Sequence, residues 1–131
     1  LAEWIRSHPH SFPPIVVHIT DGESQDGDPV PYAEAVRKLS TSDGNVLLFN
    51  CHLSSTAADP FMFPSKPEGL PDRLARMLFE MSSVLPDRFH RYAAEEGFEL
   101  QAGARGMAFN ANMVCLIQFL NMGTQAATIL R

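Results

Sequence analysis

Residues 14–24 constrain the fold of this chain more than any other stretch. The run 15–20, Ile-Val-Val-His-Ile-Thr, is apolar on both faces except at His18, which is typical of a parallel strand covered on each side. The run stops abruptly at Asp21 and Gly22, and an acidic loop follows. In an open α/β sheet, ligands bind in the crevice beyond the carboxyl ends of the strands. The stretch therefore directs the Asp21 carboxylate toward the surface on which such proteins carry their function.

A helix and a second strand follow at the spacing of a strand–helix–strand unit. Residues 30–39 have one apolar helical face, and residues 46–51 form another buried apolar run. The unit from residue 15 to residue 51 has about the length of a right-handed crossover between parallel strands. The sequence therefore predicts an α/β fold, a three-layer Rossmann-like sandwich with a mainly parallel sheet. The apolar helical face consists of Tyr32, Ala35, Val36 and Leu39.

The middle of the chain predicts a loop and two helices. Residues 57–70 are rich in proline and aromatic residues and predict a loop that packs with its own side chains. A helix over 70–84 has an apolar stripe at helical spacing, which indicates core rather than a cofactor site. Another helix runs over 86–96, and Gly97 supplies its stop. The stripe of the first helix consists of Leu74, Met77, Leu78 and Met81.

The last part of the chain predicts a Gly-rich segment followed by a helix. Residues 103–111 are expected to form a loop with a short strand. Asn112 is the expected N-cap of a final helix over 113–122, because its side chain can accept from a backbone amide of the first turn. Gly123 is expected to close that helix.

The length suits a single domain over residues 1–131, long enough to bury a core. Within it, residues 1–55 are the predicted strand–helix–strand core, and residues 56–131 are a helical elaboration with the final helix. Cys51 and Cys115 both lie in apolar runs, which predicts buried free thiols and leaves a disulfide open. No secretory feature is visible, so a cytoplasmic location is favoured over secretion.

The charge of the chain excludes some classes of partner. A net charge of -5 and a pI near 5.4 argue against nonspecific binding to nucleic acid or to an anionic membrane, because both need basic patches. No apolar run approaches the roughly 18 residues of a membrane span. Arg105, in the Gly-rich segment, is expected to be a solvated surface arginine, with a contact to the acidic loop or to a partner as the alternative.

The heptapeptide 18–24, His-Ile-Thr-Asp-Gly-Glu-Ser, resembles the third metal-site loop of von Willebrand factor type A domains. That family has a Rossmann-type three-layer sandwich with a metal ion-dependent adhesion site at the carboxyl ends of its strands. Its site combines an Asp-x-Ser-x-Ser motif, a threonine from a middle loop and an aspartate in a Thr-Asp-Gly loop. Only the last of these matches here, at Asp21, and no Asp-x-Ser-x-Ser occurs in the chain. The chain thus resembles the C-terminal portion of such a domain.

The resemblance implies a site for Mg²⁺, or for Mn²⁺ or Ca²⁺, in the complete domain only. Asp21 is the implied metal ligand, directly or through water. A hard divalent cation takes oxygen ligands from separate loops and can keep one position for an acidic group of a protein partner. The rim of the binding loop is implied to consist of Thr20, Gly22, Glu23 and Ser24.

The resemblance also implies that the strand over 15–20 lacks a neighbour and leaves an open sheet edge. A preceding segment, on the same polypeptide or on another chain, is expected to complete the sheet. Leu1 is not methionine and already reads as part of a helix, so we expect the natural polypeptide to begin upstream.

The leading hypothesis for function is a non-catalytic binding module for metal-dependent protein–protein recognition or assembly. One alternative is a Mg²⁺-dependent phosphoryl-transfer or hydrolase enzyme of related layout, in which Asp21 holds the metal. Another is a metal-free scaffold with a degenerate site, in which Asp21 only caps backbone amides. His52 with Ser54 and Ser55 suggests a base and a nucleophile, although such residues more often cap a loop. An upstream Asp-x-Ser-x-Ser favours the binding module, whereas a nucleophilic aspartate or a phosphate loop favours the enzyme.

Overall fold

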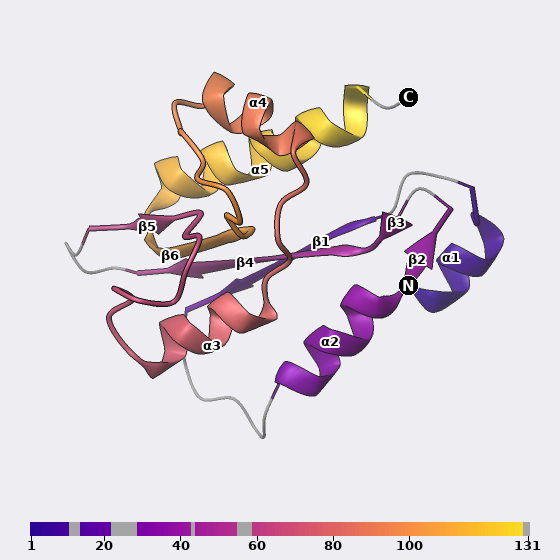
Figure 1. Ribbon diagram of the computed structural model, residues 1–131, viewed down its shortest axis with the longest axis horizontal. Helices are drawn as coiled ribbons and strands as arrows, with labels where there is room; N and C mark the ends of the chain where they lie inside the picture. Colours follow the sequence, from indigo (N-terminus) through magenta and orange to yellow (C-terminus); the bar gives the residue numbers. More distant parts are fainter. Residues whose placement is uncertain (11–13, 22–28, 43, 55–58, 130–131) are drawn as a thin grey trace.

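The structure is a computed structural model that describes residues 1–10, 14–21, 29–42, 44–54 and 59–129 (Figure 1). Six strands and five helices lie within these residues. In chain order they are α1 (Ala2–Ser7), β1 (Ile15–Thr20), α2 (Val30–Lys38), β2 (Ser40–Thr41), β3 (Gly44–Asn45), β4 (Leu47–Leu53), β5 (Phe61–Met62), α3 (Arg73–Met81), α4 (Arg88–Glu95), β6 (Met107–Ala111) and α5 (Met113–Ile129).

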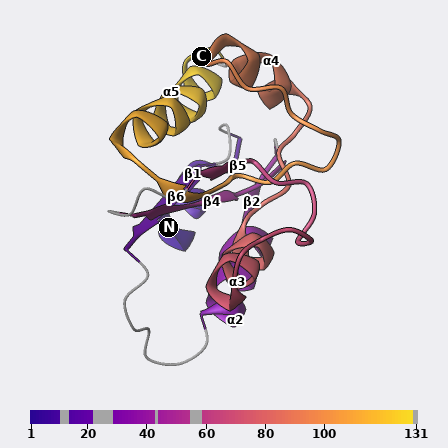
Figure 2. The same cartoon turned by 90° about the vertical axis from the view of Figure 1, so that its left-hand side faces the viewer.

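A four-stranded sheet in the order β1-β4-β6-β5 forms the middle layer of the molecule. β1 is parallel to β4 and β4 is parallel to β6, whereas the short β5 runs antiparallel to β6. Helices α4 and α5 cover one face of the sheet, and α2 and α3 cover the other (Figures 1 and 2). The predicted α/β fold with a mainly parallel sheet in three layers is confirmed.

The strand–helix–strand unit lies where the sequence predicted it. β1 and β4 pair in parallel and in register, from Ile15 opposite Leu47 to Thr20 opposite His52. Both strands consist largely of β-branched or other apolar residues, which suit a sheet buried on both faces. α2 connects them and lies on the face that α3 also covers (Figure 1).

Phe49 is the centre of the core between the sheet and the helices α4 and α5. It is completely buried, and its ring makes edge contacts with Phe89 of α4 and Phe119 of α5, both at 5.7 Å between centroids. Gly106, just before β6, supports this position, because a Cβ at residue 106 would lie 2.4 Å from Cδ1 of Phe49. Only a residue without a side chain lets β6 approach β4 at this point.

Cys51 and Cys115 are both buried and free, as the sequence predicted. Burial, with a smaller contribution from Cys115, raises the pKa of the Cys51 thiol from an ordinary value of 9.0 to about 11. A raised pKa in the folded state means that the folded state holds this proton more tightly than the unfolded chain does. The thiol therefore contributes stability below about pH 9, and that contribution disappears as the pH rises through about 11.

We therefore expect the free energy of unfolding to fall between pH 9 and pH 11, by about 2–3 kcal/mol from Cys51 alone. Urea unfolding across this range measures the effect. Cys51→Ala serves as the comparison, since it removes the titrating thiol and should flatten this part of the curve. Parallel curves for the two proteins would show that the thiol does not contribute.

Several predicted boundaries change in the structure. The loop predicted over 57–70 contains the two-residue strand β5, and the short strands β2 and β3 pair antiparallel between α2 and β4. The helices predicted over 70–84 and 86–96 are shorter, Arg73–Met81 and Arg88–Glu95. Gly97 does follow the second of them, at φ +90°.

The final helix departs most from its prediction. Asn112 is its N-cap, since the backbone N–H of Cys115 donates to Asn112 Oδ1 at 2.9 Å. Gly123 does not close it, because α5 continues to Ile129. A glycine inside a helix costs about 1 kcal/mol relative to alanine. The burial of Phe119 and Met122 on the same helix offsets that cost.

None of the helices in the described part of the chain is long and apolar enough to cross a membrane.

Candidate functional site

The carboxyl ends of the three parallel strands meet at one edge of the sheet, which Figure 2 shows facing the viewer. The chain leaves this edge at Asp21 after β1, at Ser54 after β4 and at Asn112 after β6. The backbone N–H of Ser54 donates to the carbonyl of Ala111 at 3.1 Å and extends the pairing of β4 and β6 beyond the strands. Helix α5 begins directly at this edge (Figure 2). We call this region the carboxyl edge.

Asp21 lies at the carboxyl edge with its side chain exposed. Thr20 precedes it, half-buried, and is opposite His52 in the register of the sheet. The structure therefore has the Asp21 carboxylate at the end of a parallel strand, which is the position that the sequence predicted. The predicted rim residues Gly22, Glu23 and Ser24 lie outside the described residues.

His52 is fixed at this edge by ring stacking and by a hydrogen bond from the backbone. Its ring is buried and stacks on Phe109 of β6, with 4.2 Å between centroids and 15° between planes. The backbone N–H of Asn110 donates to His52 Nδ1 at 3.2 Å, which leaves the ring proton on Nε2. Asn110 has φ +58°, and this contact stabilises its left-handed backbone. The geometry supports the interpretation that His52 fixes the ends of β4 and β6 rather than activating a nucleophile.

A chain of hydrogen bonds connects the middle of β1 and β4 with the residue that follows α3. His18 Nδ1 lies 3.0 Å from Asn50 Oδ1, and Asn50 Nδ2 donates to Ser82 Oγ at 2.9 Å. Ser82 Oγ in turn donates to the carbonyl of Leu78 at 2.7 Å. Asn50 and Ser82 are completely buried, so their polar groups depend on these partners. His18 is therefore a hydrogen-bonded histidine.

Arg105 is not the solvated surface arginine that the sequence predicted. Its guanidinium lies 4.3 Å from the centroid of the Phe79 ring, and Nη1 donates to the carbonyls of Phe79 at 3.1 Å and Ser82 at 3.3 Å. Burial lowers the pKa of Arg105, the nearby Arg37 lowers it further, and Glu80 opposes them. Arg105 thus satisfies the last carbonyls of α3, whose C-terminal end attracts cations.

An open hollow of about 710 Å³ lies between α2 and α3, with apolar Val30, Leu74 and Met77 among its lining residues. Arg73 and Arg76 also line it. It lies in the helical layer and does not include Asp21, so it is separate from the carboxyl edge.

The residues at the carboxyl edge fit part of a ligand set for a hard cation. Carboxylate and hydroxyl oxygens are the ligands that Mg²⁺ and Ca²⁺ prefer, and Asp21, Thr20 and Ser54 carry such oxygens at the ends of two neighbouring strands. Within the described residues, no group of three or more histidines, cysteines, aspartates and glutamates comes close enough to hold a metal ion. A complete cation site would need oxygen ligands beyond those that the structure describes.

The outer edge of β1 is open in the described structure. β1 is the terminal strand of the sheet and pairs there with β4 on one side. It carries no charged side chain, and Ile19 is 46% exposed. Natural sheet edges usually carry charges, prolines or bulges that prevent pairing with another strand. The outer edge of β1 is therefore suited to accept a further strand.

Comparison with known proteins adds no relative. No protein-family model, no curated protein and no solved structure matches the chain significantly.

Proposed function

We propose that this chain is a non-catalytic binding module that uses a divalent cation at the carboxyl edge to recognise a protein partner. Asp21 contributes one oxygen ligand, and an acidic group of the partner occupies an open position on the cation. The observation that carries the proposal is the exposed Asp21 carboxylate directly after a parallel strand, at the edge where β1, β4 and β6 end.

Further ligands come, in this proposal, from a segment that pairs with the open edge of β1. A strand parallel to β1 ends at the same edge of the sheet and brings its following loop beside Asp21. The resemblance to von Willebrand factor type A domains suggests that this loop carries Asp-x-Ser-x-Ser. The segment is either an N-terminal half of the same domain or part of another chain.

A single carboxylate holds Mg²⁺ weakly, because the ion gives up its water reluctantly and needs several oxygens in octahedral order. Two loops from neighbouring strands can supply these oxygens, and the ion keeps one coordination position for a carboxylate of the partner. No residue at this edge has to transfer a proton or form a covalent bond for such recognition. The role of His52 in holding β4 to β6 is consistent with a binding function.

Mn²⁺-induced NMR line broadening tests the proposal. The sample combines the chain with a strand probe, a synthetic peptide that has a β-branched strand as long as β1 and ends in Asp-x-Ser-x-Ser. We expect broadening of amides at the carboxyl edge, such as Asp21 and Ser54, and none at Leu47 near the opposite ends of the strands. Asp21→Ala should remove the broadening.

Two outcomes would favour the other functions. Broadening that persists in Asp21→Ala would place the cation elsewhere, and its absence in both proteins would favour a metal-free scaffold. Hydrolysis of a phosphate ester that depends on Asp21 would favour the enzyme.

A further inference from the structure

The hollow between α2 and α3 combines apolar surface with positive charge. Its volume of about 710 Å³ lies within the range of small-molecule sites, roughly 300–1,000 Å³. Both helices cover the same face of the sheet (Figure 1), and the first residues of each line the hollow. Val30, Leu74 and Met77 are half-buried and pack against the core of this face, whereas Arg73 and Arg76 are exposed. The hollow therefore has an apolar base and a positively charged rim.

The arginines of the hollow are not held by the protein as other arginines of this layer are. Arg37 Nη1 donates to the carbonyl of Ser82 at 3.3 Å, and Arg105 donates to carbonyls at the end of α3. Among the described residues, neither Arg73 nor Arg76 donates a hydrogen bond or pairs with a carboxylate. Their guanidinium groups are therefore available to bind a ligand.

The position of these two arginines does not favour the helix that carries them. α3 begins at Arg73, and Arg76 follows one turn later. The N-terminal end of a helix has partial positive charge, so cations near it are destabilising. The N-cap Asp72 offsets part of this charge, but the first turns of α2 and α3 contain no acidic residue. Helix stability thus gives no reason for the arginines, whereas an anion between them would.

We propose that the hollow binds a small carboxylate with an apolar body, such as a fatty acid of medium length. The carboxylate accepts hydrogen bonds from the two arginines, and the hydrocarbon lies against Val30, Leu74 and Met77. Glu80 also lines the hollow, so two arginines and one glutamate leave a single net positive charge. That charge suits a singly charged head group better than a phosphate. It is a local property, because the whole chain has a net charge of -5.

Three probes separate the two parts of the proposed ligand. Octanoate has both parts, 1-octanol has only the apolar body, and acetate has only the carboxylate. Titrations followed by NMR amide shifts are made in EDTA, so the cation site cannot contribute. We expect octanoate to bind at least about tenfold more tightly than 1-octanol or acetate, because charged hydrogen bonds and apolar burial both add affinity. The amides that shift should include Val30 and Leu74.

Two sets of substitutions test the two parts of the hollow. Arg73→Gln combined with Arg76→Gln should weaken octanoate binding at least about tenfold and leave 1-octanol binding unchanged. Met77→Gln keeps the length of the side chain but makes it polar. It should weaken the binding of both octanoate and 1-octanol by about threefold or more.

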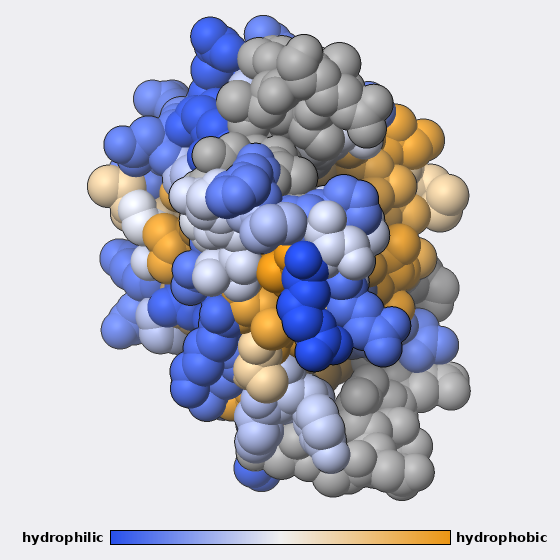
Figure 3. All heavy atoms as spheres, turned by 90° about the vertical axis from the view of Figure 1, so that its right-hand side faces the viewer, coloured by the Kyte–Doolittle hydropathy of each residue, from blue (hydrophilic) through white to orange (hydrophobic). Residues whose placement is uncertain are grey.

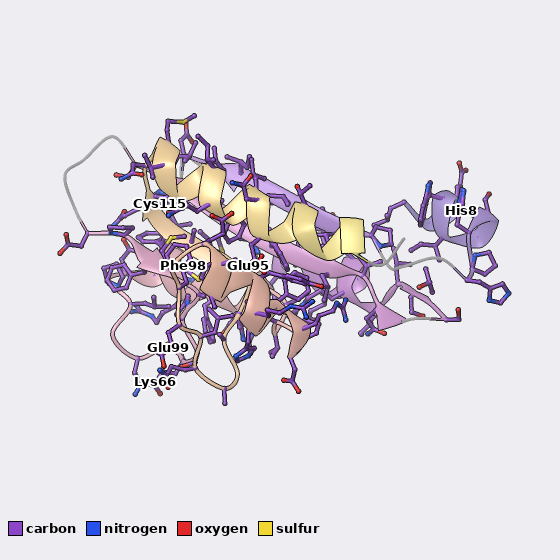
Figure 4. All side chains as sticks on the ribbon, turned by 90° about the horizontal axis from the view of Figure 1, so that it is seen from above. His8, Lys66, Glu95, Phe98, Glu99 and Cys115 are labelled. Atoms are coloured by element: carbon purple, nitrogen blue, oxygen red, sulfur yellow. The ribbon has the colours of Figure 1, made fainter. Side chains whose placement is uncertain are left out.

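Arg6→Gln combined with Arg91→Gln is the matched control, because it removes the same charge away from the hollow. Arg91 is exposed on α4, on the face of the sheet that Figure 4 shows, and Arg6 is exposed on α1, at the end marked by His8. That end faces the viewer in Figure 3, where the surface is mainly hydrophilic apart from a band along the right-hand side. The control should bind octanoate like the wild type, and circular dichroism checks that each variant is folded.

Equal affinity for octanoate and 1-octanol, or octanoate binding that survives the loss of Arg73 and Arg76, would overturn the inference. Octanoate that binds no more tightly than acetate would also overturn it. The hollow does not include Asp21, so Asp21→Ala should bind octanoate like the wild type. A failure of the metal-dependent function and a failure of this inference can therefore be distinguished.

Discussion

Phe49→Ala is expected to lower the free energy of unfolding by about 3–5 kcal/mol, the range observed for removal of a buried aromatic ring. The upper part of the range is expected because the Phe49 ring contacts rings from two different helices. The ring centroids of Phe89 on α4 and Phe119 on α5 both lie 5.7 Å from that of Phe49. If one of these helices moved inward to fill the space, it would lose contacts with the other helix. The vacated space should therefore persist as a cavity.

Urea unfolding of wild type and variant measures this loss. Tyr32→Ala removes another aromatic ring, one that is 78% exposed, and should change stability by no more than about 0.5 kcal/mol. A loss below about 1 kcal/mol for Phe49→Ala would contradict the description of Phe49 as the centre of this core.

Gly106→Ala is expected to destabilise the chain by about 1–3 kcal/mol, although alanine is usually the better residue for stability. The added methyl group would lie 2.4 Å from Cδ1 of Phe49, and the ring is completely buried. Either the ring must leave its position between Phe89 and Phe119, or β6 must separate from β4.

Gly123→Ala is the matched control for this substitution. A Cβ at residue 123 would lie 3.9 Å from Cε2 of Phe49, an ordinary contact, and the residue lies inside α5. Gly123→Ala should therefore stabilise the chain by up to about 1 kcal/mol. Combining Gly106→Ala with Phe49→Leu should cost less than the sum of the two single changes, and strict additivity would contradict the proposed clash.

The sequence predicted the first part of the fold well because its signals are local. β1 and β4 are apolar runs, and the helix between them has an apolar face, so the parallel pairing follows from short-range pattern. β6 was expected only as a short strand in a loop, although it lies between β4 and β5. Its sequence, Met-Ala-Phe-Asn-Ala, has weak strand propensity, and its place depends on Gly106 fitting against Phe49.

The candidate site was predictable only in part, because only some of its residues give a signal in the local sequence. Asp21 could be found because it directly follows a recognisable strand. The link from Asn50 to Ser82 joins residues 32 positions apart, and Arg105 reaches a carbonyl 26 positions away. No spacing rule connects such residues before the chain is folded. The local signals of the buried network were His18 and Asn50, polar residues inside largely apolar strands.

Calorimetric titration of Mg²⁺ into the chain assembled with the strand probe tests the central claim most directly. Asp21→Ala should weaken Mg²⁺ binding by at least about tenfold, because even the outer-shell partners of metal ligands commonly contribute that much. Asp87→Ala, which removes an exposed carboxylate next to α4, should bind Mg²⁺ like the wild type. Equal Mg²⁺ affinity for Asp21→Ala and wild type would contradict the account.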